Sequence, residues 1–349
     1  MSDAPRSRCC VVYVSNADSG DITVLQLDER SGALTRLQSA EVGGTVMPLA
    51  VSPDRRFLYA ARRSDPQAVV GFRIDPADGR LDLVGEAPLP ASMAYIATDR
   101  SGRFLFGASY HGNRISVSPI GADGLVQAAH QVLPTAPKAH AIRPDATNRF
   151  VFATSLGGDH VMQWRFDAAR GLLSPNEPPQ VDVRKGAGPR HLEFDAKGRF
   201  VYVLNELDAS VDLYTLDAKR GTLALQQSTD TLPPGFSGEP WAADLHLSPD
   251  GRVLYTSERR SSTIAAFAVD ASNGRLTPIG HAATQAQPRG FAIDPSGRFV
   301  LVAGQLSHAL GVHAVDPASG RLAALFEVAV GTNPTWVEAL YLPSDPVRP

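Results

Sequence analysis

The chain is a succession of short hydrophobic runs separated by polar turns rich in Gly, Pro and Asp. In the runs at 200–204 and 211–216, β-branched and aromatic residues dominate and apolar positions alternate with polar ones, a pattern that favours strands. Around residue 200 the pattern predicts four short strands, at 191–194, 200–204, 211–216 and 223–228. Similar groups follow one another along the sequence, so the hydrophobic pattern predicts an all-β protein.

Two turn patterns repeat with a nearly constant spacing. The first ends in Gly and occurs seven times, at intervals of 45 to 53 residues. Its glycines are Gly32, Gly79, Gly124, Gly171, Gly221, Gly274 and Gly320. The second is an Arg followed by an apolar residue, and it occurs at Arg56, Arg103, Arg149, Arg199, Arg252 and Arg298. Repeats of this length with four strands each are typical of β-propeller blades, which bury their faces by stacking on their neighbours.

The two ends of the chain complement each other. Residues 335–340 look like the first strand of a blade that has no continuation, and residues 11–14 look like a second strand with no first strand before it. One blade completed by both ends would close a ring, which an open solenoid does not need. The sequence thus predicts a seven-bladed β-propeller with four antiparallel strands per blade. We expect a single domain over residues 1–349, with its core at 9–342 and flexible tails at 1–8 and 343–349.

Composition and charge limit the partners of the protein. The 33 Lys and Arg residues nearly balance the 36 Asp and Glu residues, and no basic run is present, so nucleic acid is not an expected partner. No apolar segment approaches the roughly 20 residues of a membrane-spanning helix and no signal peptide is evident, which predicts a cytoplasmic protein without a membrane partner. Cys9 and Cys10 are expected to be buried free thiols, because adjacent cysteines rarely bridge. The sequence does not predict the oligomeric state.

One face of the predicted ring is expected to carry the chemistry. Both repeated turns of a four-stranded blade lie on the same face, where Asp, Pro and Gly act as turn formers. The opposite face holds the start of each innermost strand and the end of each second strand. The second strands are followed by Ala17, Arg63, Tyr110, Leu156, Glu206, Arg259 and Gln305. Immediately before these come Asn16, Arg62, Ser109, Ser155, Asn205, Glu258 and Gly304. A structural ring would repeat one residue type, so these varied and charged positions predict a functional site.

Two arginines occupy matching positions at the entrances of inner strands. Arg190 precedes Phe200 and Arg289 precedes Phe299 by the same number of residues. Because guanidinium binds carboxylate or phosphate through two parallel hydrogen bonds, the pair predicts an anion site. Further candidates at the same mouth are Arg62, Tyr110, Lys138, His140, His191, Asn205, Glu206, Asp244, His246 and Gln305.

No cofactor or metal is expected from the sequence. Asp244 and His246 alternate onto one side of their strand, but two ligands are fewer than the three of a typical catalytic zinc, and no Cys supplements them. The sequence contains no Gly-rich phosphate loop, no nucleophile elbow and no HExxH motif. The residues alone therefore predict a propeller whose channel mouth binds an anion and carries acid–base groups.

Several segments resemble the bacterial propeller-type 6-phosphogluconolactonase family, in that family's order and over nearly the whole chain. They are 186–191, 204–207 with 210–212, 241–246, 287–291 and 303–305 with 307–308. The same superfamily contains a carboxymuconate lactonising enzyme in which a His, a Glu and two Arg are implicated, and Arg190, Glu206 and Arg289 match three of these four. Near the family's His this sequence has Lys138, with His140 two residues later. Lys138 could add charge for a phosphate, His140 could take the role after a small shift, or the substrate could differ.

The resemblance implies an enzyme that hydrolyses a sugar lactone, with 6-phosphoglucono-1,5-lactone of the pentose phosphate pathway as the expected substrate. It implies that Glu206, with His191, takes a proton from water. Arg190 and Arg289 would hold the oxyanion and the substrate anion, and Lys138 or Arg62 the phosphate. The remaining substrate-binding candidates are Tyr110, His140, Asn205, Asp244, His246 and Gln305.

Three alternatives stay open at this point. A lactonase for an unphosphorylated sugar acid lactone would suit the same site, and so would a muconate-type cycloisomerase, because paired arginines bind a dicarboxylate as well as a phosphate. A non-catalytic scaffold is also compatible with the fold, since a fold does not determine function. A scaffold should expose an apolar patch, whereas the expected mouth is polar, so an enzyme is favoured.

Overall fold

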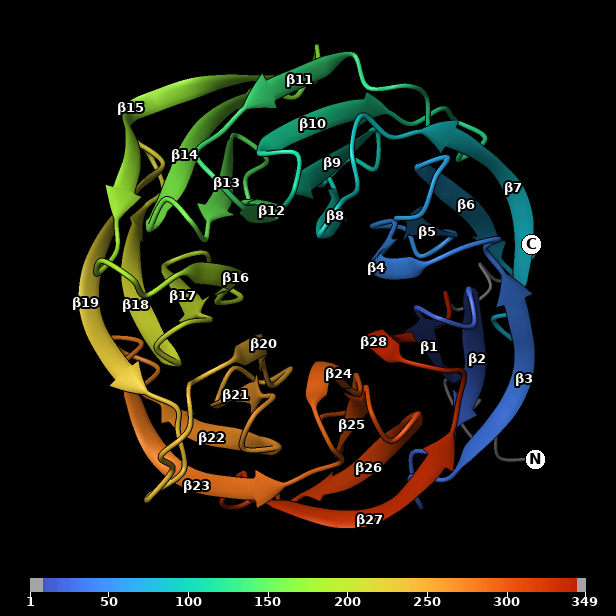
Figure 1. Cartoon of the computed structure of the whole chain (residues 1–349), viewed down its shortest axis with the longest axis vertical. Coiled ribbons are helices and arrows are strands. Elements are labelled where there is room, and N and C mark those ends of the chain that lie inside the picture. Colours follow the sequence, from blue (N-terminus) through green and yellow to red (C-terminus); the bar gives the residue numbers. More distant parts are fainter. Residues whose placement is uncertain (1–8, 344–349) are drawn as a thin grey trace, which may run out of the picture.

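The computed structural model describes residues 9–343, and every regular element within that range is a strand. The strands form seven antiparallel sheets of four, arranged as blades around a central channel (Figure 1). The prediction of an all-β, seven-bladed propeller is confirmed. Flexible tails were expected at 1–8 and 343–349, and of these, residues 1–8 and 344–349 lie outside the described residues.

Blades 1 to 6 each consist of four consecutive strands, with the first strand innermost and the fourth outermost. The strands of blades 1 to 3 are β4 (Val46–Val51), β5 (Phe57–Arg62), β6 (Ala68–Ile74), β7 (Leu81–Pro88), β8 (Tyr95–Thr98), β9 (Phe104–Ser109), β10 (Arg114–Pro119), β11 (Gln131–Pro134), β12 (Ala139–Pro144), β13 (Phe150–Ser155), β14 (His160–Asp167) and β15 (Leu172–Asp182). Those of blades 4 to 6 are β16 (Pro189–Phe194), β17 (Phe200–Asn205), β18 (Ser210–Asp217), β19 (Thr222–Asp230), β20 (Ala242–Leu247), β21 (Val253–Glu258), β22 (Thr263–Val269), β23 (Leu276–Ala283), β24 (Pro288–Ile293), β25 (Phe299–Gly304), β26 (Ala309–Val315) and β27 (Leu322–Ala329).

Blade 7 is built from both ends of the chain. Its innermost strand is β28 (Pro334–Tyr341), followed outward by β1 (Cys10–Asn16), β2 (Asp21–Leu27) and β3 (Leu34–Glu41). β28 pairs antiparallel with β1 along its whole length. The predicted closure of the ring is therefore confirmed, and Figure 1 shows the first and last strands side by side.

The repeated Gly turn has a structural role between blades. The Tyr13 hydroxyl on β1 donates to the carbonyl oxygen of Gly79 in blade 1 at 2.8 Å, and Tyr202 on β17 donates to Gly274 in blade 5 at the same distance. Gly274 has a φ of 76°, and a Cβ there would lie 2.8 Å from the Phe200 ring. Only Gly combines this backbone conformation with so close an approach, which explains the period of the sequence repeat.

The turn between the first two strands of a blade is held by its Asp. Asp99 Oδ1 accepts hydrogen bonds from the backbone N–H groups of Arg103 and Phe104 at 2.8 and 2.9 Å. This confirms the prediction that the Asp residues of this face are turn formers. Cys9 and Cys10 are free thiols, the first half-buried and the second buried. Between residues 9 and 343 the structure contains no helix that could span a membrane.

Candidate active site

The mouth of the channel is formed by residues, one per blade, that follow the second strands. The backbone N–H groups of Arg63, Glu206 and Gln305 donate to the carbonyl oxygens of Thr45, Gly188 and Gln287 at 2.7, 2.8 and 3.1 Å, respectively. These acceptors lie two residues before Met47, Arg190 and Arg289 on the inner strands. This repeated bond ties the end of each second strand to the entrance of its inner strand. We call these residues the mouth ring: Ala17, Arg63, Tyr110, Leu156, Glu206, Arg259 and Gln305.

The residue before a mouth-ring residue is directed into its own blade. Asn205 Nδ2 donates to Ser210 Oγ at 2.8 Å and to Asp212 Oδ2 at 2.9 Å. Arg62 Nη1 lies 2.8 Å from Oε2 of Glu86 on the outermost strand of blade 1. The sequence predicts that Asn205 and Arg62 bind substrate, whereas the alternation along a strand turns both side chains away from the channel mouth.

His140 occupies the same place in blade 3 as Arg190 and Arg289 in blades 4 and 6. All three residues follow the first paired residue of their inner strand, and a β-bulge begins there in each blade. Lys138 lies two residues earlier, exposed at the rim, with Nζ 5.5 Å from the centre of the Tyr110 ring. Within the repeat, His140 rather than Lys138 is therefore the residue that corresponds to Arg190 and Arg289.

Glu206 is held by two guanidinium groups. Its Oε2 accepts a hydrogen bond from Arg190 Nε at 2.8 Å and another from Arg259 Nη2 at 2.8 Å. Although burial opposes the effect, these cations hold the pKa of the Glu206 carboxyl below its usual range. Arg259 Cζ also lies over the Trp241 ring, 3.9 Å from its centre. Glu206 is thus an ionised anchor for both arginines.

His191 forms a dyad with Asp244 across the boundary between blades 4 and 5. Its Nδ1 lies 2.7 Å from Asp244 Oδ1, and its Nε2 lies 3.1 Å from Arg190 Nη1. Because a guanidinium only donates, Nε2 accepts and Nδ1 carries the proton that binds Asp244. Burial, reinforced by Arg190, lowers the pKa of His191 to about 4 even though Asp244 opposes the shift. The imidazole is therefore neutral at pH 7 and able to take up a proton.

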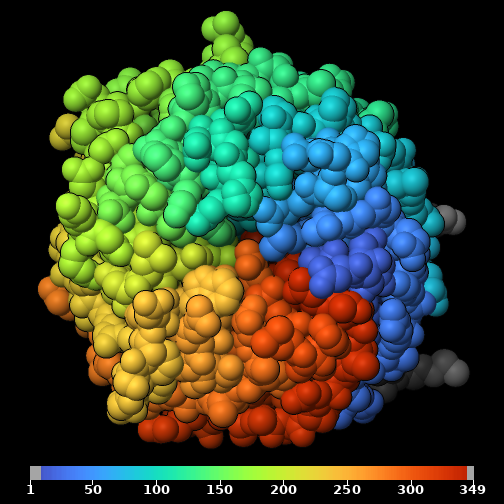
Figure 2. Space-filling view, in the orientation of Figure 1, coloured from blue at the N-terminus to red at the C-terminus, as the bar shows by residue number. Residues whose placement is uncertain are grey.

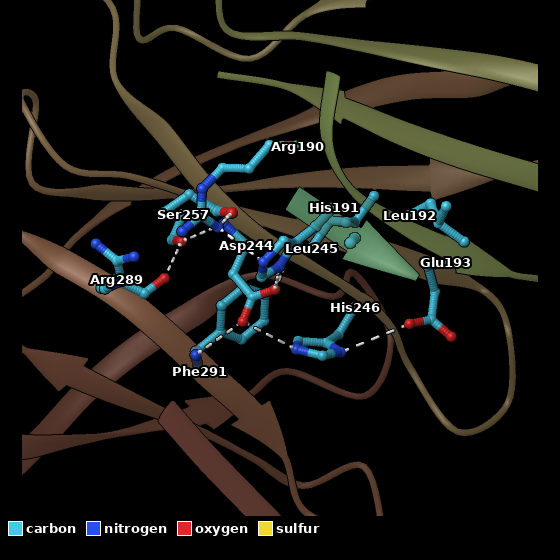
Figure 3. A network of polar contacts seen from close by, with 12 residues as sticks. Arg190, His191, Leu192, Glu193, Asp244, Leu245, His246, Ser257, Arg289 and Phe291 are labelled. Carbon is cyan, nitrogen blue, oxygen red and sulfur yellow. Dashed lines mark hydrogen bonds and ion pairs between the residues drawn. The ribbon is translucent and has the colours of Figure 1, made fainter. Parts of the chain in front are cut away.

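A second imidazole extends this dyad along the channel (Figure 3). His246 Nε2 lies 3.2 Å from Asp244 Oδ2, and its Nδ1 lies 3.7 Å from Oε2 of Glu193. The same Glu193 oxygen is 2.5 Å from Arg143 Nη1. Against the effect of burial, the two carboxylates raise the pKa of His246 to about 10. His246 is therefore an imidazolium at pH 7, with its charge next to the His191–Asp244 pair.

A small hollow lies where these groups meet. It has a volume of about 10 Å³ and is lined by Met47, Ala94, Arg190, His191, Asp244, Arg289, Gly290, Thr335 and Trp336. That is about the space one water molecule requires, so a sugar ring would lie above it. Figure 2 shows side chains filling the centre of the ring except for a narrow depression.

The Arg289 guanidinium has no hydrogen-bond or ion-pair partner among residues 9–343. Only its backbone carbonyl is engaged, by Ser257 Oγ at 2.9 Å, and Figure 3 shows the side chain directed away from that bond. Burial and the neighbouring Arg190 and Arg259 hold the pKa of Arg289 well below its usual range. An unpaired cation in this position is suited to an incoming anion or oxyanion.

The other candidates lie around this centre. The His140 ring packs against His191, with 5.1 Å between ring centres, and edge-on against Tyr110 at 6.0 Å. His140 Nδ1 is buried and has no partner among the described residues. The side-chain amide of Gln305 already has two hydrogen-bond partners, because it donates to Asn333 Oδ1 at 2.8 Å and accepts from Gln287 Nε2 at 3.0 Å.

The candidate set lacked four residues that the structure brings to the site or its supports. Arg63 and Arg259 belong to the mouth ring with Glu206, and the sequence placed them in that ring without naming them as catalytic or binding candidates. Glu193 and Arg143 join the channel network through contacts between different blades, which no repeat spacing reveals. Among residues 9–343 there is no group of three or more His, Cys, Asp or Glu residues placed to hold a metal ion.

A ring of seven four-stranded blades with arginines, imidazoles and carboxylates at its mouth has the architecture of a propeller enzyme. Residues 9–339 match the family described as "Lactonase, 7-bladed beta-propeller", and the chain belongs to this family. The resemblance found in the sequence is thereby confirmed.

Curated relatives and solved structures agree with this family. A 6-phosphogluconolactonase of Pectobacterium carotovorum is 44% identical over 95% of this chain and 99% of its own length. One of Serratia proteamaculans is 42% identical over 95% of this chain and 98% of its own length. The periplasmic gluconolactonase of Pseudomonas aeruginosa superposes with a TM-score of 0.90 at 31% identity, covering 97% of this chain and all of its own. A putative 6-phosphogluconolactonase of Bacteroides fragilis gives 0.89 at 28% identity, with 97% and 100% covered.

Proposed function

We propose that this protein hydrolyses 6-phosphoglucono-1,5-lactone to 6-phosphogluconate, a step of the pentose phosphate pathway, in the cytoplasm. The relatives named for this activity are 42 to 44% identical over nearly the whole chain. The observation that carries the proposal is the pair formed by the neutral His191 and the Asp244 carboxylate, which adjoins the unpaired Arg289 guanidinium in one hollow. A base beside a cation is what hydrolysis of a lactone carbonyl requires.

His191 supplies the base in this mechanism. Once Arg190 Nη1 gives up its hydrogen bond to His191 Nε2, this nitrogen takes a proton from a water molecule in the hollow while the water oxygen bonds to the lactone carbonyl carbon. Asp244 stabilises the imidazolium that results, as a carboxylate does in other His dyads. The carbonyl electrons move to the oxygen, and Arg289, supported by Arg190, stabilises the negative charge on it.

Ring opening completes the reaction. The tetrahedral intermediate reforms the carbonyl, and the bond between the carbonyl carbon and the ring oxygen breaks. His191 returns its proton to that oxygen, which becomes a hydroxyl group of the open chain. The new carboxylic acid then loses its own proton to solvent, so that one water is consumed and the enzyme regains its starting state.

Glu206 acts in this proposal as the group that orients the two arginines. If it took a proton, it would weaken its hydrogen bonds to both Arg190 and Arg259. Protonation of His191 ends one hydrogen bond, the one that Nε2 accepts from Arg190, but strengthens the bond from Nδ1 to Asp244. This comparison favours His191 over Glu206, the base expected from the sequence. His140, a neutral ring with a free Nδ1, is left to bind a substrate hydroxyl.

A lactone without a phosphate is the second candidate substrate. It is favoured by the structural likeness to the periplasmic gluconolactonase of Pseudomonas aeruginosa. A muconate-type cycloisomerase and a non-catalytic scaffold gain no such support from the relatives.

The test is a lactonase assay on freshly generated 6-phosphogluconolactone beside glucono-δ-lactone, with spontaneous hydrolysis subtracted. The wild-type protein and His191→Asn are compared, with and without EDTA. The proposal expects turnover of the phosphorylated lactone that EDTA does not change and that His191→Asn lowers by about 10²–10⁴-fold. Turnover of glucono-δ-lactone alone would select the second candidate, and turnover of neither lactone would contradict the proposed activity.

A further inference from the structure

Arg63 is a half-buried cation of the mouth ring without a carboxylate partner among residues 9–343. It follows β5 in the same position that Glu206 holds after β17. Its Nε donates to Ser92 Oγ at 2.8 Å, and its Nη1 contacts the sulfur of Met47. The preceding Arg62, in contrast, is paired with Glu86 outside the channel. Two adjacent arginines thus have opposite environments.

Arg63 is connected to the hollow through Met47. Met47, which it contacts, lines the hollow together with Arg289 and His191. Blade 1 supplies Arg63 and blade 4 supplies His191, and these blades lie on different sides of the channel in Figure 1. A substrate whose carbonyl lies at His191 and Arg289 can therefore extend toward Arg63.

The charges at the mouth leave Arg63 uncompensated. Glu206 is the carboxylate of the mouth ring, and its hydrogen bonds go to Arg190 and Arg259. Arg289 is also unpaired, and the two cations are close enough for Arg63 to contribute to the lowered pKa of Arg289. Burying a guanidinium without a counter-charge costs free energy, which an anionic ligand would offset.

We infer that Arg63, with the Ser92 hydroxyl beside it, binds the phosphate of the substrate and makes the enzyme prefer the phosphorylated lactone. This inference rests on the proposed function. It gives the two unpaired arginines different roles. Arg289 faces the reacting carbonyl from the hollow, and Arg63 binds the phosphate end of the substrate. A guanidinium is the side chain that matches phosphate best, through two parallel hydrogen bonds.

The kinetic experiment compares Arg63→Gln with Arg62→Gln, its neighbour outside the site. Arg63→Gln should lower kcat/KM for 6-phosphogluconolactone by about 10- to 100-fold, the range of a lost charge-assisted hydrogen bond, and leave glucono-δ-lactone within about twofold. Arg62→Gln should change neither. Equal losses on both lactones, or no loss on the phosphorylated one, would overturn the role of Arg63. Thermal unfolding of Arg63→Gln should occur at or above the wild-type temperature, because an uncompensated buried charge has been removed.

A binding experiment separates this inference from the proposed activity. Calorimetric titration with 6-phosphogluconate and with gluconate needs no turnover, since neither is a lactone. The wild-type protein should bind 6-phosphogluconate more tightly, and Arg63→Gln should abolish the difference between the two ligands. If the protein turns over no lactone yet shows this difference, the activity fails and the phosphate site stands. If wild type and Arg63→Gln bind both ligands alike, the phosphate site fails whatever the activity.

Discussion

His191 donates from Nδ1 to Oδ1 of Asp244 at 2.7 Å, and this bond joins the inner strands of two neighbouring blades. It leaves Nε2 as the only position at which the ring can accept a proton. A blade cannot form the pair by itself, because His191 lies on β16 and Asp244 on β20. The tautomer with its proton on Nδ1 is therefore a product of blade packing.

Asp244→Asn should abolish most of the activity while leaving the fold intact. An Asn amide can donate to Nδ1 and so favour the tautomer with its proton on Nε2, and it cannot stabilise the imidazolium. We expect kcat to fall by about 10²–10⁴-fold, the range that general base catalysis supplies. Asp212→Asn is the control, because Asp212 is a buried carboxylate that accepts a hydrogen bond from Asn205 inside blade 4. A comparable loss of kcat in both variants would contradict the special role of Asp244.

His246→Gln should shift the pH dependence of catalysis. His191 must be neutral to accept a proton, so kcat/KM should fall as the pH drops through its pKa, about 4 in the wild type. The His246 imidazolium is one of the positive charges that keep this pKa low. Its removal should therefore raise the pKa of His191 and move the acid limb of the profile to higher pH.

The other groups facing His191 stay in place in this variant. They are Arg190 on its own strand, Asp244 on β20, His140 on β12 and the rings of Tyr95 and Trp336. Gln at 246 can still donate to Asp244, so the measured shift reports the lost charge. His281→Gln, on the outer strand β23, should leave the profile unchanged. An unmoved acid limb in His246→Gln would show that His191 is not the titrating base.

His246 also makes conformational stability depend on pH. Its pKa is raised to about 10 in the folded protein, from an ordinary value of about 6.5 in an unfolded chain. The group therefore stabilises the fold fully below pH 6.5, and this contribution is lost as the pH rises from there to 10. Urea unfolding of the wild type and His246→Gln should differ most at pH 6 and converge toward pH 10. A difference that stays constant over this range would contradict the linkage.

The fold could be predicted because one physical requirement repeats along the sequence. Each blade must bury its faces on its neighbours, so Gly79 and Gly274 recur where a Tyr of the adjacent blade contacts the turn. The position of the mouth could be predicted for the same reason, since only there does the repeat vary in residue type and charge.

The chemistry of the site could be predicted only in part. Whether Arg62 or Arg63 faces the mouth depends on a single step of strand alternation, and spacing alone did not decide it. His140 lies as far before Phe150 as Arg190 before Phe200, so its place was contained in the repeat. The repeat did not contain the contacts of His246 with Asp244 and Glu193, because these contacts depend on the distance between blades.

Glu206→Gln distinguishes an orienting carboxylate from a general base. If Glu206 orients the two arginines, we expect kcat/KM to fall moderately, by about tenfold. The Gln side chain retains an oxygen that accepts hydrogen bonds from Arg190 and Arg259, but it lacks the charge that strengthens them. The acid limb of the pH profile should remain, since His191 still titrates. Glu86→Gln is the matched control, because Glu86 is an exposed carboxylate that pairs with Arg62 outside the channel. A loss of about 10²–10⁴-fold together with a vanished acid limb would instead assign proton abstraction to Glu206.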